Sequence, residues 1–165
     1  MPTYTVLFAG RGGWFSTNFS VRAVLSPEIY RTFLIWAVLT MGYFYVLLIR
    51  LAMAVPRTAL RRTVMLLTLA ACLSLSYAVL IPYLPDHIPG WARLHVALAA
   101  GSCVLVLLAM LLLLLYRRLW GLVRIWLALN GCYGLLFLWG GMVTSALEVC
   151  FTVSAALLLR KMWVS

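Results

Sequence analysis

Residues 96–116, VALAAGSCVLVLLAMLLLLLY, form an apolar run without one charged side chain. A helix needs roughly 20 apolar residues to cross a hydrocarbon core about 30 Å thick, so this run predicts a transmembrane helix. Three further runs are long and apolar, namely Thr32–Ile49, Thr63–Pro85 and Ile125–Leu159. All four runs together contain a single charged residue, Glu148. A soluble chain of 165 residues could not bury so much apolar surface, and we therefore predict an integral membrane protein.

Local signals divide these runs into helices. The sequence Ser26-Pro27-Glu28 predicts a helix start, because serine caps, proline suits the first helical position and glutamate favours the positive end of the helix dipole. The pair Gly140-Gly141 predicts a turn inside the last run, which is long enough for two tight crossings. The predicted fold is all-α, an integral membrane bundle of four transmembrane helices with an external, interfacial N-terminal segment. We place this segment at residues 1–30 and the bundle at 31–165, with helices at about 31–54, 63–81, 91–116, 119–139 and 142–161, the last two sharing the final apolar run.

The basic residues predict the orientation of the bundle. A net charge of +10 would suggest nucleic acid in a soluble protein, but basic residues beside membrane helices set topology, and we expect no nucleic-acid partner. Nine of the thirteen flank the same helix ends, namely Arg50, Arg57, Arg61, Arg62, Arg117, Arg118, Arg124, Arg160 and Lys161. The other ends carry Arg11, Arg22, Arg31 and Arg93 together with the acids Glu28 and Asp86. We therefore expect an N-terminus outside and a C-terminus in the cytoplasm, in a bacterial plasma membrane.

The N-terminal segment has no features of a cleavable signal peptide. Residues 1–10 lack a basic start, and their apolar stretch is short. The aromatic side chains of Trp14 and Phe15 stand between Arg11 and Arg22, which is typical of a segment lying in the membrane interface. We expect this segment to lie outside, against the surface of the membrane.

The sequence lacks the motifs of metal, cofactor or nucleophilic chemistry. The four cysteines are spread one per helix without a Cys-x-x-Cys pair, which favours packing roles. Asp86 and His87 could complete a zinc site with His95 and Glu148, but no Glu-x-x-His or His-x-x-x-His spacing supports it. No serine lies in a Gly-x-Ser-x-Gly turn. We expect no metal, no cofactor and no catalytic residue, and we lean against an enzyme.

Glu148 is the first candidate for a functional site. A carboxylate at membrane depth is costly and normally faces the bundle interior or water, with a partner. His95 lies at a similar predicted depth from the same side, so a Glu148–His95 contact is the first that we expect. The other candidate partners of Glu148 are Arg31, Arg93 and the hydroxyls of Ser16, Thr17 and Ser20. The pair is either part of a polar pocket open to the outer leaflet or a structural link between helices. The candidate ligand-binding residues of such a pocket are Asn18, Arg22, Arg31, Arg93, His95, Gly101 and Glu148.

A second set of polar residues lies on one face of the helix predicted at 119–139. Asn130, Tyr133, Gly134 and Phe137 are spaced three or four residues apart and therefore share that face. They could orient a substrate or an ion at mid-membrane depth. The pattern is more typical of a seam between packed helices, and we expect that role.

Short motifs give the chain a resemblance to a known group. They are FSTNFSV at 15–21 followed by SPE at 26–28, LHVA at 94–97 and ALE at 146–148. In these motifs the chain resembles the Frag1/DRAM/Sfk1-type small polytopic membrane proteins and their bacterial relatives of unknown function. The resemblance implies a helical bundle with a lumen-facing polar pocket formed by that histidine and that glutamate. It also implies a role in lipid handling or partner organisation rather than catalysis.

Two classes of function follow from these features. The first is a non-catalytic membrane protein that binds a lipid or small amphiphile at an outer-leaflet polar pocket, or that serves as a subunit of a membrane complex. The alternative is a small transporter or a membrane-embedded enzyme using His95 and Glu148. We favour the first class, because few titratable residues are present from which to build acid, base and nucleophile roles. The expected partners are membrane lipid and either a second copy of the chain or a partner subunit.

Cysteine labelling in intact cells tests the predicted orientation. In a background without the native cysteines, an impermeant reagent should label His87→Cys strongly and leave Ala59→Cys unlabelled, because position 87 is expected outside and position 59 in the cytoplasm. The opposite labelling pattern would invert the predicted topology.

Overall fold

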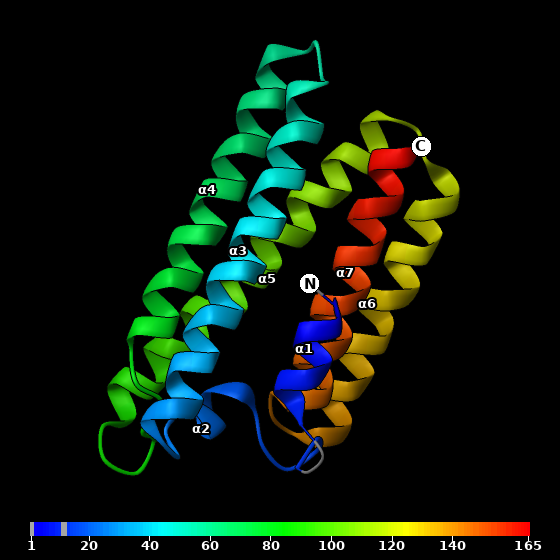
Figure 1. Ribbon diagram of the computed structural model, residues 1–165. Coiled ribbons are helices and arrows are strands. Elements are labelled where there is room, and N and C mark those ends of the chain that lie inside the picture. The colour runs from blue at the N-terminus through cyan, green and yellow to red at the C-terminus, as the bar shows by residue number, and fades with distance from the viewer. Residues whose placement is uncertain (1, 11–12) are drawn as a thin grey trace.

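The computed structural model describes residues 2–10 and 13–165, which fold into helices joined by short turns (Figure 1). Arg11 therefore lies outside the described residues. Within the described ranges no strand occurs, so the all-α prediction is confirmed. Seven helices are present there, namely α1 (Pro2–Ala9), α2 (Phe19–Ala23), α3 (Pro27–Met53), α4 (Thr58–Leu80), α5 (Pro89–Tyr116), α6 (Trp120–Gly140) and α7 (Ser145–Val164).

Four of the helices, α3 to α6, are long and apolar enough to cross a membrane. This confirms the prediction of an integral membrane bundle with four such helices. The fifth long helix, α7, carries Glu148, Arg160 and Lys161 and packs against α3 and α6. The five long helices alternate in direction along the bundle (Figure 1). The end of α7 lies at the same end of the bundle as the α3–α4 turn.

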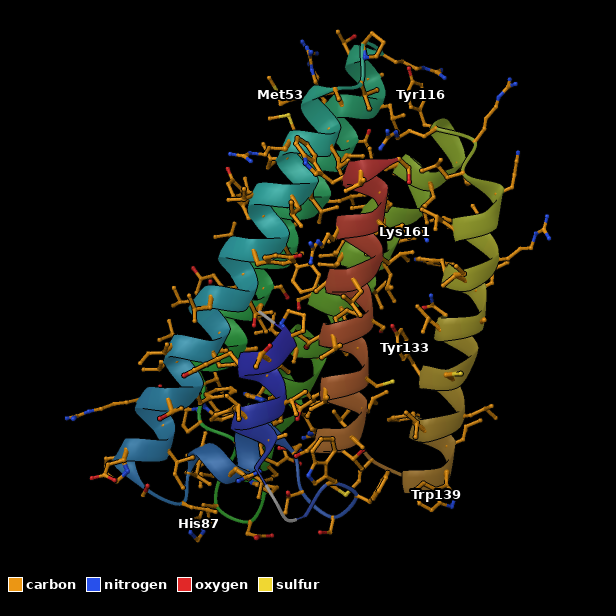
Figure 2. The ribbon with its side chains drawn as sticks, turned by 45° about the vertical axis from the view of Figure 1, so that its right-hand side comes forward. Met53, His87, Tyr116, Tyr133, Trp139 and Lys161 are labelled. Atoms are coloured by element: carbon orange, nitrogen blue, oxygen red, sulfur yellow. The ribbon has the colours of Figure 1, made fainter. Side chains whose placement is uncertain are left out.

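The two ends of the bundle differ in charge. Nine of the thirteen basic residues lie in the turns at 54–57 and 117–119, in the helix ends beside these turns and at the end of α7, and we call this the basic end. Figure 2 shows Met53 and Tyr116 near it, while His87 and Trp139 lie at the opposite end. The opposite end comprises the turns at 81–88 and 141–144 together with α2. The basic turns therefore lie at one end of the bundle, because consecutive long helices run in opposite directions.

Local chemistry explains where the helices begin and end. The Ser26 hydroxyl accepts a hydrogen bond from the Ile29 N–H at 3.2 Å, and Pro27 opens α3 as predicted. Gly141 ends α6 in the left-handed conformation, with φ of 64°, which glycine adopts at little cost. The largest difference from the predicted boundaries is at α4, which begins at Thr58 rather than near residue 63. Arginine is a good helix former, so the basic stretch after Pro56 is helical instead of forming a loop.

The core falls into two clusters. The first lies toward the basic end and joins α3, α4, α5 and α7 through fully buried side chains that include Leu48, Val64, Met110 and Leu159. The second lies toward the opposite end and is aromatic. There the rings of Phe19 and Trp36 meet edge to face with centroids 4.8 Å apart, and Phe8 and Phe33 complete the cluster.

The N-terminal segment enters the bundle instead of lying across its end. Helix α1 packs against α3 and α7, and the side chains of Thr5 and Ala9 are completely buried (Figure 1). The Trp36 indole N–H donates to the Thr5 hydroxyl at 3.1 Å. The external, interfacial position of this segment stays a prediction, and what the structure shows for residues 2–9 is that they pack against α3 and α7. These residues carry no charge, so packing them against other apolar helices does not require the burial of an ion, which would cost free energy.

The aromatic cluster gives a stability prediction. Phe19→Ala should lower the free energy of unfolding by about 3–5 kcal/mol, because the ring is completely buried and its removal leaves a cavity. Phe15→Ala is the matched control, since that ring is 55% exposed. Thermal-shift measurements in one detergent would compare the two variants. Equal melting temperatures would contradict the buried position of α2.

Candidate functional site

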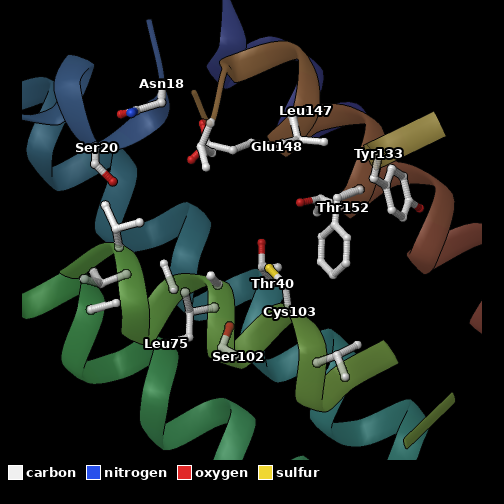
Figure 3. A pocket seen from close by; sticks show the side chains of 18 of the residues that line it. Asn18, Ser20, Thr40, Leu75, Ser102, Cys103, Tyr133, Leu147, Glu148 and Thr152 are labelled. Carbon is white, nitrogen blue, oxygen red and sulfur yellow. The ribbon is translucent and has the colours of Figure 1, made fainter. Parts of the chain in front are cut away.

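A cavity of about 430 Å³ lies in the half of the bundle toward α2 (Figure 3). Its walls come from α3, α4, α5, α6 and α7, and most of the lining side chains are apolar. Asn18, Ser20, His95 and Glu148 line it together, and these four polar side chains converge from α2, its N-cap, α5 and α7. The cavity therefore combines an apolar interior with a polar end.

Glu148 stands in the first turn of α7. The Thr144 hydroxyl caps this helix by accepting from the Leu147 N–H at 3.3 Å, which places the glutamate beside the cavity. Its Oε2 atom accepts a hydrogen bond from the Phe19 N–H at 2.7 Å. No described group donates to Oε1. The carboxyl group thus uses one oxygen to hold the backbone of α2 and keeps the other for the cavity, where Figure 3 shows its side chain.

Asn18 is held rigidly at the polar end. Its Oδ1 atom accepts from the Val21 N–H at 2.8 Å and so caps α2. The residue is only 8% exposed, and it lines the cavity (Figure 3). Within the described part of the chain its Nδ2 group has no hydrogen-bond partner. Because the residue borders the cavity, a ligand or water there could accept from this amide.

His95 has both ring nitrogens in hydrogen bonds. Nδ1 lies 2.9 Å from the Ile81 carbonyl oxygen, and Nε2 lies 2.8 Å from the Ser20 hydroxyl. Because the carbonyl can only accept, Nδ1 carries a proton, and in the neutral ring Nε2 accepts from Ser20. The Tyr83 ring lies beside the imidazole, with centroids 5.4 Å apart. His95 therefore ties α5 to α2 and to the turn after α4.

The predicted contact between Glu148 and His95 takes a different form. No direct hydrogen bond between them occurs in the ranges that the structure describes. Each instead binds one of two adjacent residues, Phe19 through its N–H and Ser20 through its hydroxyl. Both side chains line the cavity, and α2 links them. The sequence could not reveal this, because the N-terminal segment was expected at the membrane surface.

The other predicted site residues lie outside the cavity lining. The Arg22 guanidinium donates to the Ala9 carbonyl oxygen and so holds the end of α1. Arg31 is exposed on α3, and Arg93 lines a separate, shallow pocket with Tyr83. A Cβ atom at Gly101 would meet the Ser74 hydroxyl of α4 at 3.8 Å, so this glycine faces its neighbouring helix.

Two further expectations concern metal ions and cysteines. Asp86 and His87 are exposed in the turn after α4, away from the cavity lining. Among the described residues no group of three or more histidine, cysteine, aspartate or glutamate side chains could hold a metal ion. Cys72, Cys103 and Cys150 are partly buried, and Cys132 is exposed.

The polar face of α6 lines the cavity as well. Asn130, Tyr133, Gly134 and Phe137, which we expected in a packing seam, all border it. The Tyr133 hydroxyl and the Ser154 hydroxyl are 2.5 Å apart, and this bond joins α6 to α7. The spacing of these residues was a usable signal, but it could not distinguish a seam from a cavity wall.

The cavity opens sideways between α5 and α6. Within α6 the buried residues are Leu122 and Val123, both near its start, so the rest of the helix packs loosely. The exposed lining residues belong to the two facing helices, with Val96 and Ala100 on α5 and Phe137 on α6 among them. In a membrane this opening would face lipid hydrocarbon.

Comparisons with known proteins add no assignment. No protein-family model matches the chain, and no curated protein or solved structure matches it. The resemblance to the Frag1/DRAM/Sfk1-type proteins therefore stays a prediction from short motifs.

The hydrogen bond between Ser20 and His95 gives the third prediction. Ser20→Ala leaves Nε2 without its partner and should cost about 1–3 kcal/mol of unfolding free energy. Combined with His95→Ala, it should cost less than the sum of the two single losses. Thermal-shift measurements on the three variants test this, with the exposed Ser16→Ala as the control. Strictly additive losses would remove this contact from the site.

Proposed function

We propose that the protein is a non-catalytic membrane protein that binds one lipid or small amphiphile in the cavity. The observation that carries this proposal is an apolar space of about 430 Å³ with polar groups gathered at one end. Small-molecule sites typically have roughly 300–1,000 Å³ and a few placed polar groups, and the cavity falls in that range. An amphiphile would place its tail among the apolar walls and its polar group beside Asn18 and Glu148.

The sideways opening supports a ligand that comes from the bilayer. A water-soluble ligand would have to cross lipid to enter between α5 and α6, whereas an acyl or alkyl chain is already there. The polar end lies away from the basic end of the bundle. Because basic loops favour the cytoplasm, we assign the polar end to the outer leaflet and the C-terminus to the cytoplasm.

The alternative of a transporter or embedded enzyme has less support. Both ring nitrogens of His95 are engaged in hydrogen bonds that hold helices together, so neither nitrogen is free to exchange a proton with a substrate. Glu148 is similarly engaged through Oε2. Turnover of a lipid or peptide substrate that Glu148→Gln abolishes in folded protein would nevertheless replace the binding proposal with the enzymatic one. An association with a second copy or a partner subunit stays a prediction.

Two glycines of α6 provide a matched test of binding. Gly134 lines the cavity and Gly131 does not, and a Cβ atom at either position meets nothing within 4 Å. Gly134→Leu should fill the space and displace a copurifying lipid, whereas Gly131→Leu should retain it. Both changes add the same side chain and the same gain in helix propensity. Native mass spectrometry of gently extracted protein would count the bound lipid.

Equal lipid retention by the two leucine variants would contradict binding in this cavity. The choice of Gly134 follows from the structure, because Gly101 faces Ser74 of α4. A leucine at Gly101 would disturb the packing of α4 on α5, and lipid loss there would say little about the cavity.

A further inference from the structure

The charge in the cavity lining is unbalanced. Glu148 is the one acidic residue among the described lining residues, and no lysine or arginine is among them. Arg22 is turned toward the Ala9 carbonyl and Arg31 is exposed, so neither contributes a counter-charge to the cavity wall. A buried carboxylate without a cation is costly, and such groups in membranes normally find a partner.

The hydrogen-bonding groups left free at the polar end indicate what kind of ligand group would fit there. Oε1 of Glu148 is an acceptor to which no described group donates. The carboxyl group itself is held in place by the hydrogen bond from the Phe19 N–H to Oε2. Thr152 is 3% exposed, lines the same wall one turn further along α7, and has a hydroxyl that can accept or donate. Asn18 adds an amide at the same end. A ligand group with several donors could bind Oε1 of Glu148 and the Thr152 hydroxyl together.

We propose that the amphiphile bound in the cavity is a cation, a long-chain aliphatic amine whose ammonium group pairs with Glu148. This inference rests on the proposed binding function and names its ligand class. The ammonium supplies both the counter-charge and three donors, while the alkyl chain occupies the apolar walls. An anionic head group would meet Glu148 without any described lining cation to offset the repulsion.

Three probes with the same alkyl chain separate the head-group chemistry. Dodecylamine, dodecanol and dodecanoate carry positive, zero and negative charge at neutral pH. The wild-type protein in nanodiscs of zwitterionic lipid should bind them in that order of affinity. Native mass spectrometry titrations would measure the bound fraction, and empty nanodiscs would correct for partitioning of each probe into lipid.

Glu148→Gln isolates the charge. The glutamine oxygen can still accept from the Phe19 N–H, so the anchor of α2 is kept while the negative charge is lost. Dodecylamine affinity should fall by about tenfold or more, because charge-assisted hydrogen bonds are the stronger ones. Dodecanol affinity should change far less. The wild-type ranking needs no variant, so the proposal can fail even where Glu148→Gln does not fold.

The outcomes separate this inference from the function on which it rests. Equal binding of the three probes, or tighter binding of dodecanoate, would overturn the cationic ligand and leave amphiphile binding intact. Loss of all three affinities in parallel on Glu148→Gln would overturn it too, since the charge would then act only through the fold. If none of the probes binds above the empty-nanodisc level, amphiphile binding itself fails, and this inference with it.

Discussion

The hydrogen bonds between the N-terminal segment and the start of α7 are the constraint on which the site depends. The first N–H groups of a helix have no partner within the helix, and at membrane depth water does not supply one. Here the Thr17 carbonyl accepts from the Ser145 N–H at 2.7 Å, and the Trp14 carbonyl accepts from the Ala146 N–H at 2.8 Å. In the opposite direction, the Glu148 carboxyl group on α7 accepts from the Phe19 N–H of α2. Two segments about 130 residues apart in sequence are thereby locked together.

That lock also builds the polar end of the cavity. The turn that satisfies α7 carries Asn18 and Ser20 to the cavity wall, and the aromatic ring of Phe19 points the other way, into the cluster with Trp36. His95 then fastens α5 to the same turn. Removing any of these contacts would loosen both the packing and the head-group site. These residues hold the helices together, and in the proposed function they would also contact the head group, so the two interpretations that the sequence left open are not exclusive.

Sequence patterns predicted the bundle well, because charge and hydropathy respond directly to the membrane. They also identified Glu148, His95 and Asn18, since polar groups at membrane depth are costly and few. The position of α1 could not be predicted, because an apolar octapeptide suits a membrane surface and a bundle interior equally. Gly101 was expected in the site and Gly134 in a seam, yet only Gly134 lines the cavity. Which face of a helix meets a void depends on the packing of its neighbours, which periodicity does not encode.

The loose packing of α6 has an energetic consequence. Its few buried side chains lie near the basic end, so along most of its length it is held by contacts such as the Tyr133–Ser154 bond rather than by a continuous core. Helices in lipid associate through close packing, so a helix with few close contacts is held only weakly against its neighbours. A ligand that fills the space between α5 and α6 would supply the missing contacts. Anything that binds the folded state stabilises it in proportion to the logarithm of its concentration. In the proposed function the position of α6 would therefore depend on the ligand in the cavity, and α6, which borders the opening, is the helix that ligand binding would order.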